Sequence, residues 1–305
     1  MADNTSATYH VPVMLDECME ALAVKSDGVY ADVTFGGGGH SSAILGRLSE
    51  GGHLYAFDRD ADSEANAVDD LRFTFVRGNF AYLANFMRYY GVEALDGVLA
   101  DLGVSSHHLD AEDRGFSFRR DAVLDMRMNT RGGMRACDLL NTYDEERIAA
   151  VLRNYGEVRN AGRIAAAVAR RREERPFATV ADFLDVLKPF VPPFAEKKEL
   201  PKLFQALRIE VNDEMGSLCS MLRACGKLLK PGGRLVVMTY HSLEDRIVKN
   251  FIKTGNTDGT VEKDFYGRVT TIFRQVNPKV IVPGDDEVAR NPRSRSAKLR
   301  IAERL

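Results

Sequence analysis

Four consecutive glycines, Gly36 to Gly39, follow an apolar segment in the sequence ADVTFGGGGHSSAIL (31–45). Glycine has no Cβ, so it adopts backbone conformations closed to other residues and lets a ligand contact the main chain. A plain strand-to-helix turn needs only one or two glycines, and a longer run raises the entropic cost of ordering the loop. The run therefore favours a ligand-binding loop.

Two aspartates stand at the ends of apolar segments that follow this loop. Asp58 ends LYAFD, and Asp101 follows DGVLA. A carboxylate at the position of Asp58 can accept hydrogen bonds from both hydroxyls of a ribose, or it can cap a helix. Asp101 would face the same crevice as Asp58, or it could cap its own loop.

The elements that must position these residues alternate between strand and helix. Strands are expected over 28–34, 52–58, 73–78 and 95–103, with helical patterns after the first three, including 40–48 and 80–91. Such alternation predicts parallel βαβ units, whose ligands bind at the carboxyl ends of the strands.

The alternation stops at about residue 110. Residues 110–203 contain helical signals and no convincing strand, with Asp144 and Thr179 as candidate N-caps. A long amphipathic helix over 202–229, a Pro-Gly-Gly turn and a further strand and helix follow. Two late apolar runs, 268–273 and 297–303, could form a closing antiparallel pair. We therefore predict an α/β domain formed by residues 1–109 and 204–305, interrupted by a helical domain over 110–203.

The overall composition limits the classes of protein that fit. The chain has 305 residues, 45% of them hydrophobic, and a net charge of −2, so any nucleic-acid binding must use local basic patches. Arginines gather over 163–175 and over 290–304, although helical ion pairs could neutralise the first group and the second could be a charged edge strand. The segment FSFRR (116–120) could stack a base or seat the insertion on the main domain.

The cysteines and the apolar segments indicate where the protein acts. The four cysteines form no CxxC pair, which indicates a reducing compartment rather than a disulfide framework. No segment resembles a signal peptide or a membrane span, so we expect a cytoplasmic protein without membrane contact. No His/Cys spacing indicates a metal site.

Three cofactor classes use a glycine turn after the first strand. A phosphate-binding loop of the GxxxxGK[ST] type is excluded because its lysine is missing, and the dinucleotide pattern GxGxxG fails because Ser41 or Ser42 occupies its third glycine. S-adenosylmethionine carries no phosphate and needs neither pattern. The segment LLKPGGRLVV and the acidic residue at Asp101 favour a methyltransferase, while an NAD-linked oxidoreductase remains the alternative.

Eight ordered segments carry a resemblance to a known family. They are HVPVMLDE, TFGGGGHS, AFDRD, DLGVSS, RGFSFRRDAVLDMRM, FQALRIEVNDE, LKPGGRLVVMTYHSLEDRIVK and NPRSRSAKLRIAER. Together, from about His10 to Arg304, they resemble the ribosomal RNA small-subunit methyltransferase H (MraW) family. The resemblance implies a Rossmann-like class I methyltransferase sheet that uses S-adenosylmethionine to methylate the exocyclic N4 amine of a cytidine in 16S ribosomal RNA. It also implies a small ribosomal subunit as partner, with the inserted helical domain recognising the substrate.

The resemblance also implies which residues contact the cofactor. These are Gly38, Gly39, His40, Asp58, Phe80, Asp101 and His108, the last standing where the family usually has glutamine. A non-catalytic assembly factor with a relic cofactor fold is a further alternative, but the intact glycines and aspartates argue against it. Monomer and homodimer both stay open.

The expected substrate defines the chemistry that the site must supply. Cytosine N4 is a poor nucleophile because its lone pair is delocalised into the ring, so a hydrogen-bond acceptor near its N–H would assist the attack. We expect Asp101 to be this acceptor, with Ser105 and Ser106 orienting the base and Phe80 offering its ring to the adenine. His241 could contact the substrate or be a structural histidine, and the reaction requires no metal.

Overall fold

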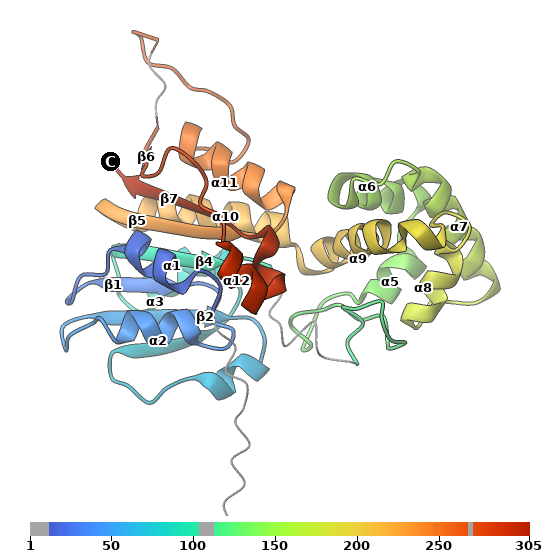
Figure 1. Ribbon diagram of the computed structural model, residues 1–305, viewed down its shortest axis with the longest axis horizontal. Helices are drawn as coiled ribbons and strands as arrows, with labels where there is room; N and C mark the ends of the chain where they lie inside the picture. Colours follow the sequence, from blue (N-terminus) through green and yellow to red (C-terminus); the bar gives the residue numbers. More distant parts are fainter. Residues whose placement is uncertain (1–11, 104–112, 268–270) are drawn as a thin grey trace, which may run out of the picture. The chain divides into compact units, whose positions relative to one another are not determined.

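The computed structural model describes residues 12–103, 113–267 and 271–305. The chain forms two compact units (Figure 1), of which unit 1 comprises Met1–Gly103 and Gly216–Leu305 and unit 2 comprises Val104–Met215. The boundaries of unit 2 differ from the expected 110 and 203, because the whole of helix α9 (Glu196–Asn212) packs on α6 (Glu145–Gly156).

Unit 1 is built on a seven-stranded sheet with the order β3-β2-β1-β4-β5-β7-β6. The strands are β1 (Val29–Asp32), β2 (His53–Asp58), β3 (Phe73–Arg77), β4 (Leu95–Asp101), β5 (Leu229–Thr239), β6 (Phe273–Gln275) and β7 (Lys298–Arg304). Strands β1 to β5 are parallel, whereas β7 is antiparallel to β5 and β6. This order confirms the α/β class and the first four predicted strands. Along the chain, successive strands are added on one side of β1 up to β3 and then on its other side from β4, although β1 to β5 all stay parallel. Doubly wound sheets bind ligands at this switch point between β1 and β4.

Helices cover both faces of this sheet, as Figure 1 shows. On one face α1 (Leu15–Leu22) and α2 (Gly39–Leu45) bury apolar side chains against Leu99 and Val236. On the other face, Val98 and Val237 pack with three helices. These are α3 (Leu83–Tyr89), α10 (Glu214–Leu228) and α11 (Ser242–Thr254). Successive side chains of a strand point to opposite faces of the sheet, so each central strand contributes to the apolar cores on both faces.

The long helix predicted over 202–229 is wrong, because the structure has two helices there. Helix α9 ends at Asn212, and α10 begins after Asp213, whose φ of 46° is left-handed. The Asn212 side chain accepts a hydrogen bond from the Met128 amide and donates one to the Met126 carbonyl. The amphipathic pattern continues through the break, which these contacts of Asn212 accompany.

Smaller elements also differ from the prediction. The segment after β2 forms a 3-10 helix, η1 (Asp62–Asn66), and the Pro-Gly-Gly segment lies inside β5, where the register against β4 shifts. The late antiparallel pair exists, but its first strand starts only at Phe273. The remaining short elements are η2 (Phe80–Tyr82), η3 (Pro193–Ala195), α12 (Asp285–Arg290) and η4 (Pro292–Ser296).

In the described part of 113–203, unit 2 consists of helices and loops, with an isolated β-bridge between Val123 and Thr179 and no strand of the sheet. Besides α6 and α9 it contains α5 (Ala136–Thr142), α7 (Ala161–Glu174) and α8 (Val180–Leu187), around one apolar core. The predicted caps are confirmed, since Asp144 accepts from the Arg147 amide and Thr179 from the Asp182 amide. No helix of the described residues is long and apolar enough to cross a membrane.

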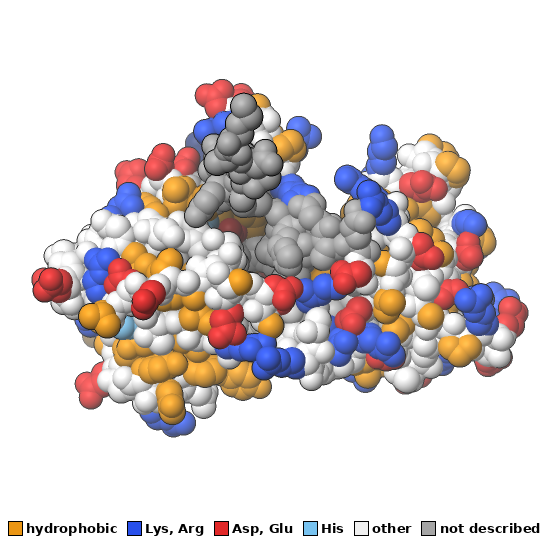
Figure 2. All heavy atoms as spheres, turned by 90° about the horizontal axis from the view of Figure 1, so that it is seen from below, with side chains coloured by type: hydrophobic (Ala, Val, Ile, Leu, Met, Phe, Trp, Pro, Cys, Tyr) orange, Lys and Arg blue, Asp and Glu red, His pale blue; other side chains and the backbone are white. Residues whose placement is uncertain are grey.

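The aromatic and basic side chains of unit 2 contribute to its own stability. Phe116 is buried in the core and Phe118 packs against Phe204, so both rings of FSFRR contribute to the core of unit 2. On α7, Arg171 pairs with a carboxylate and Arg172 donates to two carbonyls at the end of α5. Figure 2 shows Lys and Arg side chains interspersed with Asp and Glu on the face in view.

Candidate cofactor site and active site

The glycine loop joins β1 to α2 at the point where the strand order reverses. Gly36 and Gly38 have φ of +51° and +77°, conformations that L side chains rarely adopt, which explains glycine at both positions. The Gly36 carbonyl accepts from the Asn66 side chain, which fixes the loop. A Cβ on Gly37 would have nothing within 4 Å, so the loop is open on that side.

Gly39 is a glycine for a different reason. A Cβ there would lie 2.5 Å from the ring of Pro12, so Gly39 allows close packing within the protein. The sequence predicted a cofactor contact at Gly39; the structure adds a packing role and leaves a backbone contact as a proposal.

Asp58 lies at the carboxyl end of β2, with its carboxylate turned to the glycine loop. Oδ2 accepts from the Gly36 amide at 2.9 Å, and Oδ1 accepts from the Asp60 amide at 2.8 Å. Each carboxylate oxygen can accept a second hydrogen bond, so both retain capacity for a ligand hydroxyl. The two amides therefore orient the Asp58 carboxylate and leave both of its oxygens able to accept a further hydrogen bond.

A third aspartate, Asp32, was missed by the sequence analysis. It ends β1 and is buried, with Oδ2 accepting from the Ser41 hydroxyl at 2.7 Å and Oδ1 from the Thr34 amide at 3.1 Å. Burial raises its pKa, while His40 and these hydrogen bonds act against the rise. Ser41, which occupies the third glycine position of the dinucleotide pattern, thus donates a hydrogen bond to the buried Asp32 carboxylate. The signal was present, because Asp32 ends its strand as Asp58 and Asp101 end theirs.

Asp101 ends β4 and is held between two side chains from other elements. Tyr240, directly after β5, donates its hydroxyl to Asp101 Oδ1 at 2.8 Å, and His40 Nδ1 lies 4.0 Å from Oδ2. Because His40 Nε2 lies 3.1 Å from the Val13 carbonyl, which can only accept, Nε2 carries a proton and Nδ1 faces the carboxylate. Tyr240 gave no sequence signal beyond its place beside His241.

The electrostatics of this carboxylate are unusual for an aspartate. Burial raises the pKa of Asp101 to about 6, although His40 and the Tyr240 hydrogen bond act to lower it. The side chain nevertheless keeps 24% of its surface exposed. An accessible carboxylate whose pKa is near neutrality can accept a proton at physiological pH and release it again.

Phe80 lies in η2, directly after the neighbouring strand β3. Its ring packs partly against the apolar core of unit 1, and the Arg59 guanidinium carbon lies 5.5 Å from the ring centroid. The two expectations for the ring, core packing and contact with a ligand, are therefore compatible.

Several predicted residues are not part of this arrangement. His108, Ser105 and Ser106 lie outside the described residues. His241 is the N-cap of α11, where its Nδ1 accepts from the Glu244 amide at 3.5 Å, which is a structural role. The structure thus brings Gly38, His40, Asp58 and Asp101 to one edge of the sheet.

The sequence matches the model of the MraW methylase family over residues 7–305. The chain belongs to this methylase family. It is 60% identical over 296 residues to the ribosomal RNA small subunit methyltransferase H of Phocaeicola vulgatus, with 97% of both chains covered. Over 304 residues it is also 60% identical to the protein of that name from Parabacteroides distasonis, covering 99% of this chain and 100% of the relative. Among solved structures, a putative rRNA-methylase from Clostridium thermocellum is similar at 12% identity and a TM-score of 0.45, covering 97% of this chain and 100% of that one.

For a methylase, the arrangement separates two tasks along the edge of the sheet. The loop from Gly36 to Gly38 and the oriented carboxylate of Asp58 offer main-chain and acceptor contacts at β1 and β2. Asp101, one strand further at β4, offers a proton acceptor. A methyl donor bound by the first group would meet the acceptor of the second group at the switch point.

Proposed function

We propose that this methylase transfers a methyl group from S-adenosylmethionine to the exocyclic N4 amine of a cytidine in 16S ribosomal RNA. The family and the names of the relatives support the class of reaction and substrate. The observation that carries the proposal is the partly exposed Asp101 carboxylate, held by Tyr240 at the end of β4 beside the glycine loop.

The residues at the strand ends fit S-adenosylmethionine. The cofactor supplies an electrophilic methyl group on a sulfonium sulfur. Asp58 would hold the ribose hydroxyls, since its oxygens are oriented by two amides and still accept. The main chain of Gly38, Gly39 and His40 would approach the amino acid part, and Phe80 the adenine. The open side of Gly37 provides space for this approach. His108 would complete the contacts.

Asp101 would accept a hydrogen bond from the N4 amine and take its proton. As the nitrogen attacks, the new N–C bond forms while the C–S bond breaks, and the amine must lose one proton. A carboxylate with a pKa of about 6 is ionised at pH 7.5 and ready to receive it. Alignment of the amine with the methyl group would contribute a further large term, on the order of 7–11 kcal/mol in favourable cases.

The same substrate suggests the partner of the protein and the compartment in which it acts. We propose that a small ribosomal subunit presents the cytidine, that the helical unit recognises this particle, and that the protein acts in the cytoplasm. The sequence leaves open whether it acts as a monomer or a homodimer.

Incubation with labelled S-adenosylmethionine and small subunits lacking the modification tests the proposal. We expect label in N4-methylated cytidine after nucleoside analysis. Asp101→Asn should lose this activity while Asp69→Asn, an exposed control, should keep it. Label on protein or on another nucleoside would contradict the proposal. Calorimetry that detects NAD binding and no S-adenosylmethionine binding would favour an oxidoreductase instead.

A further inference from the structure

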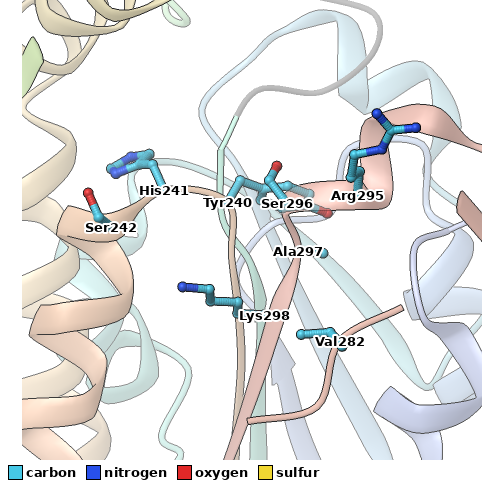
Figure 3. A pocket seen from close by; sticks show the side chains of 8 residues that line it. All are labelled: Tyr240, His241, Ser242, Val282, Arg295, Ser296, Ala297 and Lys298. Atoms are coloured by element: carbon cyan, nitrogen blue, oxygen red, sulfur yellow. The ribbon is translucent and has the colours of Figure 1, made fainter. Parts of the chain in front are cut away.

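A cavity of about 220 Å³ lies in unit 1 beside the proposed active site. Figure 3 shows its lining, which comes from the segment that joins β5 to α11, from the start of α11, from η4 and from the start of β7, with one residue of the loop before α12. The lining residues are Tyr240, His241, Ser242, Val282, Arg295, Ser296, Ala297 and Lys298. None of these eight is acidic, and the volume far exceeds what one water molecule needs.

Two cationic residues, Arg295 and Lys298, are among the residues that line this cavity. Figure 3 shows Lys298 extending from β7 towards α11, whereas the guanidinium of Arg295, on the η4 side, points outward from the other lining side chains. Arg295 is exposed and forms no ion pair or hydrogen bond with any other described residue. Lys298 Nζ lies 3.6 Å from Asp245 Oδ2, and its side chain is 43% exposed.

The carboxylates nearest the cavity already have partners. Asp245 accepts two hydrogen bonds from Arg300, at 2.7 and 3.1 Å. Glu244 is buried and accepts from the Tyr240 amide, and its Oε1 lies 3.1 Å from His241 Nε2. Asp245 brings one negative charge against the two positive charges of Lys298 and Arg300, so this group keeps a net charge of +1, to which Arg295 adds another.

Other basic residues of the same tail have hydrogen-bond partners away from the cavity. Arg300 is bound to Asp245, and Arg304 donates to the carbonyls of Ile272 and Leu305. Arg290 Nε donates to the Asp286 carbonyl. The basic side chains of the tail thus differ in their partners, and Arg295 and Lys298 are the two that line the cavity.

The position of the cavity links it to the reaction. Tyr240 contributes to the lining and also donates its hydroxyl to Asp101. We propose that this cavity binds a backbone phosphate of the substrate RNA close to the target nucleotide, with Arg295 and Lys298 as its cationic contacts. This inference rests on the proposed function. Arginine and lysine are the side chains that most often bind phosphate oxygens, and the hydroxyls of Ser242 and Ser296 suit the same group.

Salt-dependent binding tests the assignment without requiring methyl transfer. Full-length protein carrying a fluorophore at its N-terminus is titrated with unmodified small ribosomal subunits over a range of KCl concentrations. The double variant Arg295→Gln, Lys298→Gln should bind about tenfold more weakly at low salt. Its slope of log affinity against log salt should be less steep by about 1.4, or about 0.7 for each lost contact with single-stranded RNA. Arg88→Gln, an exposed arginine of α3, is the matched control and should leave both values unchanged.

The outcomes separate this inference from the proposed function. A reduced slope with unchanged thermal unfolding supports the phosphate site even if no methyl transfer is detected. A double variant that binds like wild type overturns it, even if wild type methylates RNA. Weaker binding with an unchanged salt slope would indicate a protein contact on the subunit and would also overturn it. A last outcome concerns inorganic phosphate. If phosphate stabilises the wild type but not the double variant, while both proteins bind the subunit equally, the site holds a free anion and the proposed contact with RNA is overturned.

Discussion

Replacing Asp101 with asparagine should stabilise the protein at neutral pH while it abolishes methyl transfer. The substitution removes the charge but keeps the shape, and an asparagine Oδ1 can still accept from Tyr240. Burial raises the pKa of Asp101 from 3.8 to about 6. One pKa unit corresponds to about 1.4 kcal/mol, so ionising this group in the folded protein costs about 3 kcal/mol. Because the side chain is 24% exposed, solvent reduces this cost, and about 1–3 kcal/mol is expected.

The sign of the pH dependence follows from proton binding. Between pH 3.8 and about 6 the folded protein keeps the Asp101 proton, whereas the unfolded chain has lost it. The wild type therefore loses stability as pH rises through this window, and the full cost is present above pH 6. The asparagine variant has no such cost, so its advantage should be largest at pH 7.5 and should shrink towards zero at pH 4.

Urea unfolding of both proteins at pH 7.5 and pH 4.5 measures this difference. The free energy of unfolding of Asp101→Asn should exceed that of wild type by about 1–3 kcal/mol at pH 7.5 and by about 1 kcal/mol or less at pH 4.5. Asp69→Asn should change neither value by more than about 0.5 kcal/mol. Methyl transfer by Asp101→Asn should fall by about a hundredfold or more. The reasoning is refuted if the variant is less stable than wild type at pH 7.5, or if the difference is the same at both pH values.

Two further predictions concern the neighbours of this group. Tyr240→Phe removes a hydrogen bond that lowers the pKa of Asp101, so the midpoint of the pH–activity profile should move above that of the wild type, and an unmoved midpoint would exclude this positioning role. Gly39→Ala should destabilise the fold by about 1–3 kcal/mol, because its Cβ would lie 2.5 Å from Pro12. Gly37→Ala should unfold at the wild-type temperature but bind S-adenosylmethionine more weakly in calorimetry, since its Cβ enters open space beside the loop. Equal unfolding temperatures for the two alanine variants would contradict the distinction.

The sequence by itself determined the parallel part of the sheet and two of the three aspartates at its strand ends. Apolar runs that alternate with helical patterns define β1 to β4, and the rule that parallel strands end at one edge brings Asp58 and Asp101 together. The glycine run marked the loop between them. These features are local, or follow from general rules of topology, so a single sequence contains them.

Tertiary contacts decided the rest of the site. Tyr240 donates to Asp101 across 139 positions of sequence, and the hydrogen bond from Ser41 to the buried Asp32 follows from no short sequence pattern. The break at Asp213 depends on hydrogen bonds from Asn212 to a segment more than eighty residues earlier, although the helical pattern continues unbroken through it. In each case a polar side chain must find its partner in the folded interior, because leaving it unpaired there costs free energy, and only the packed structure identifies that partner.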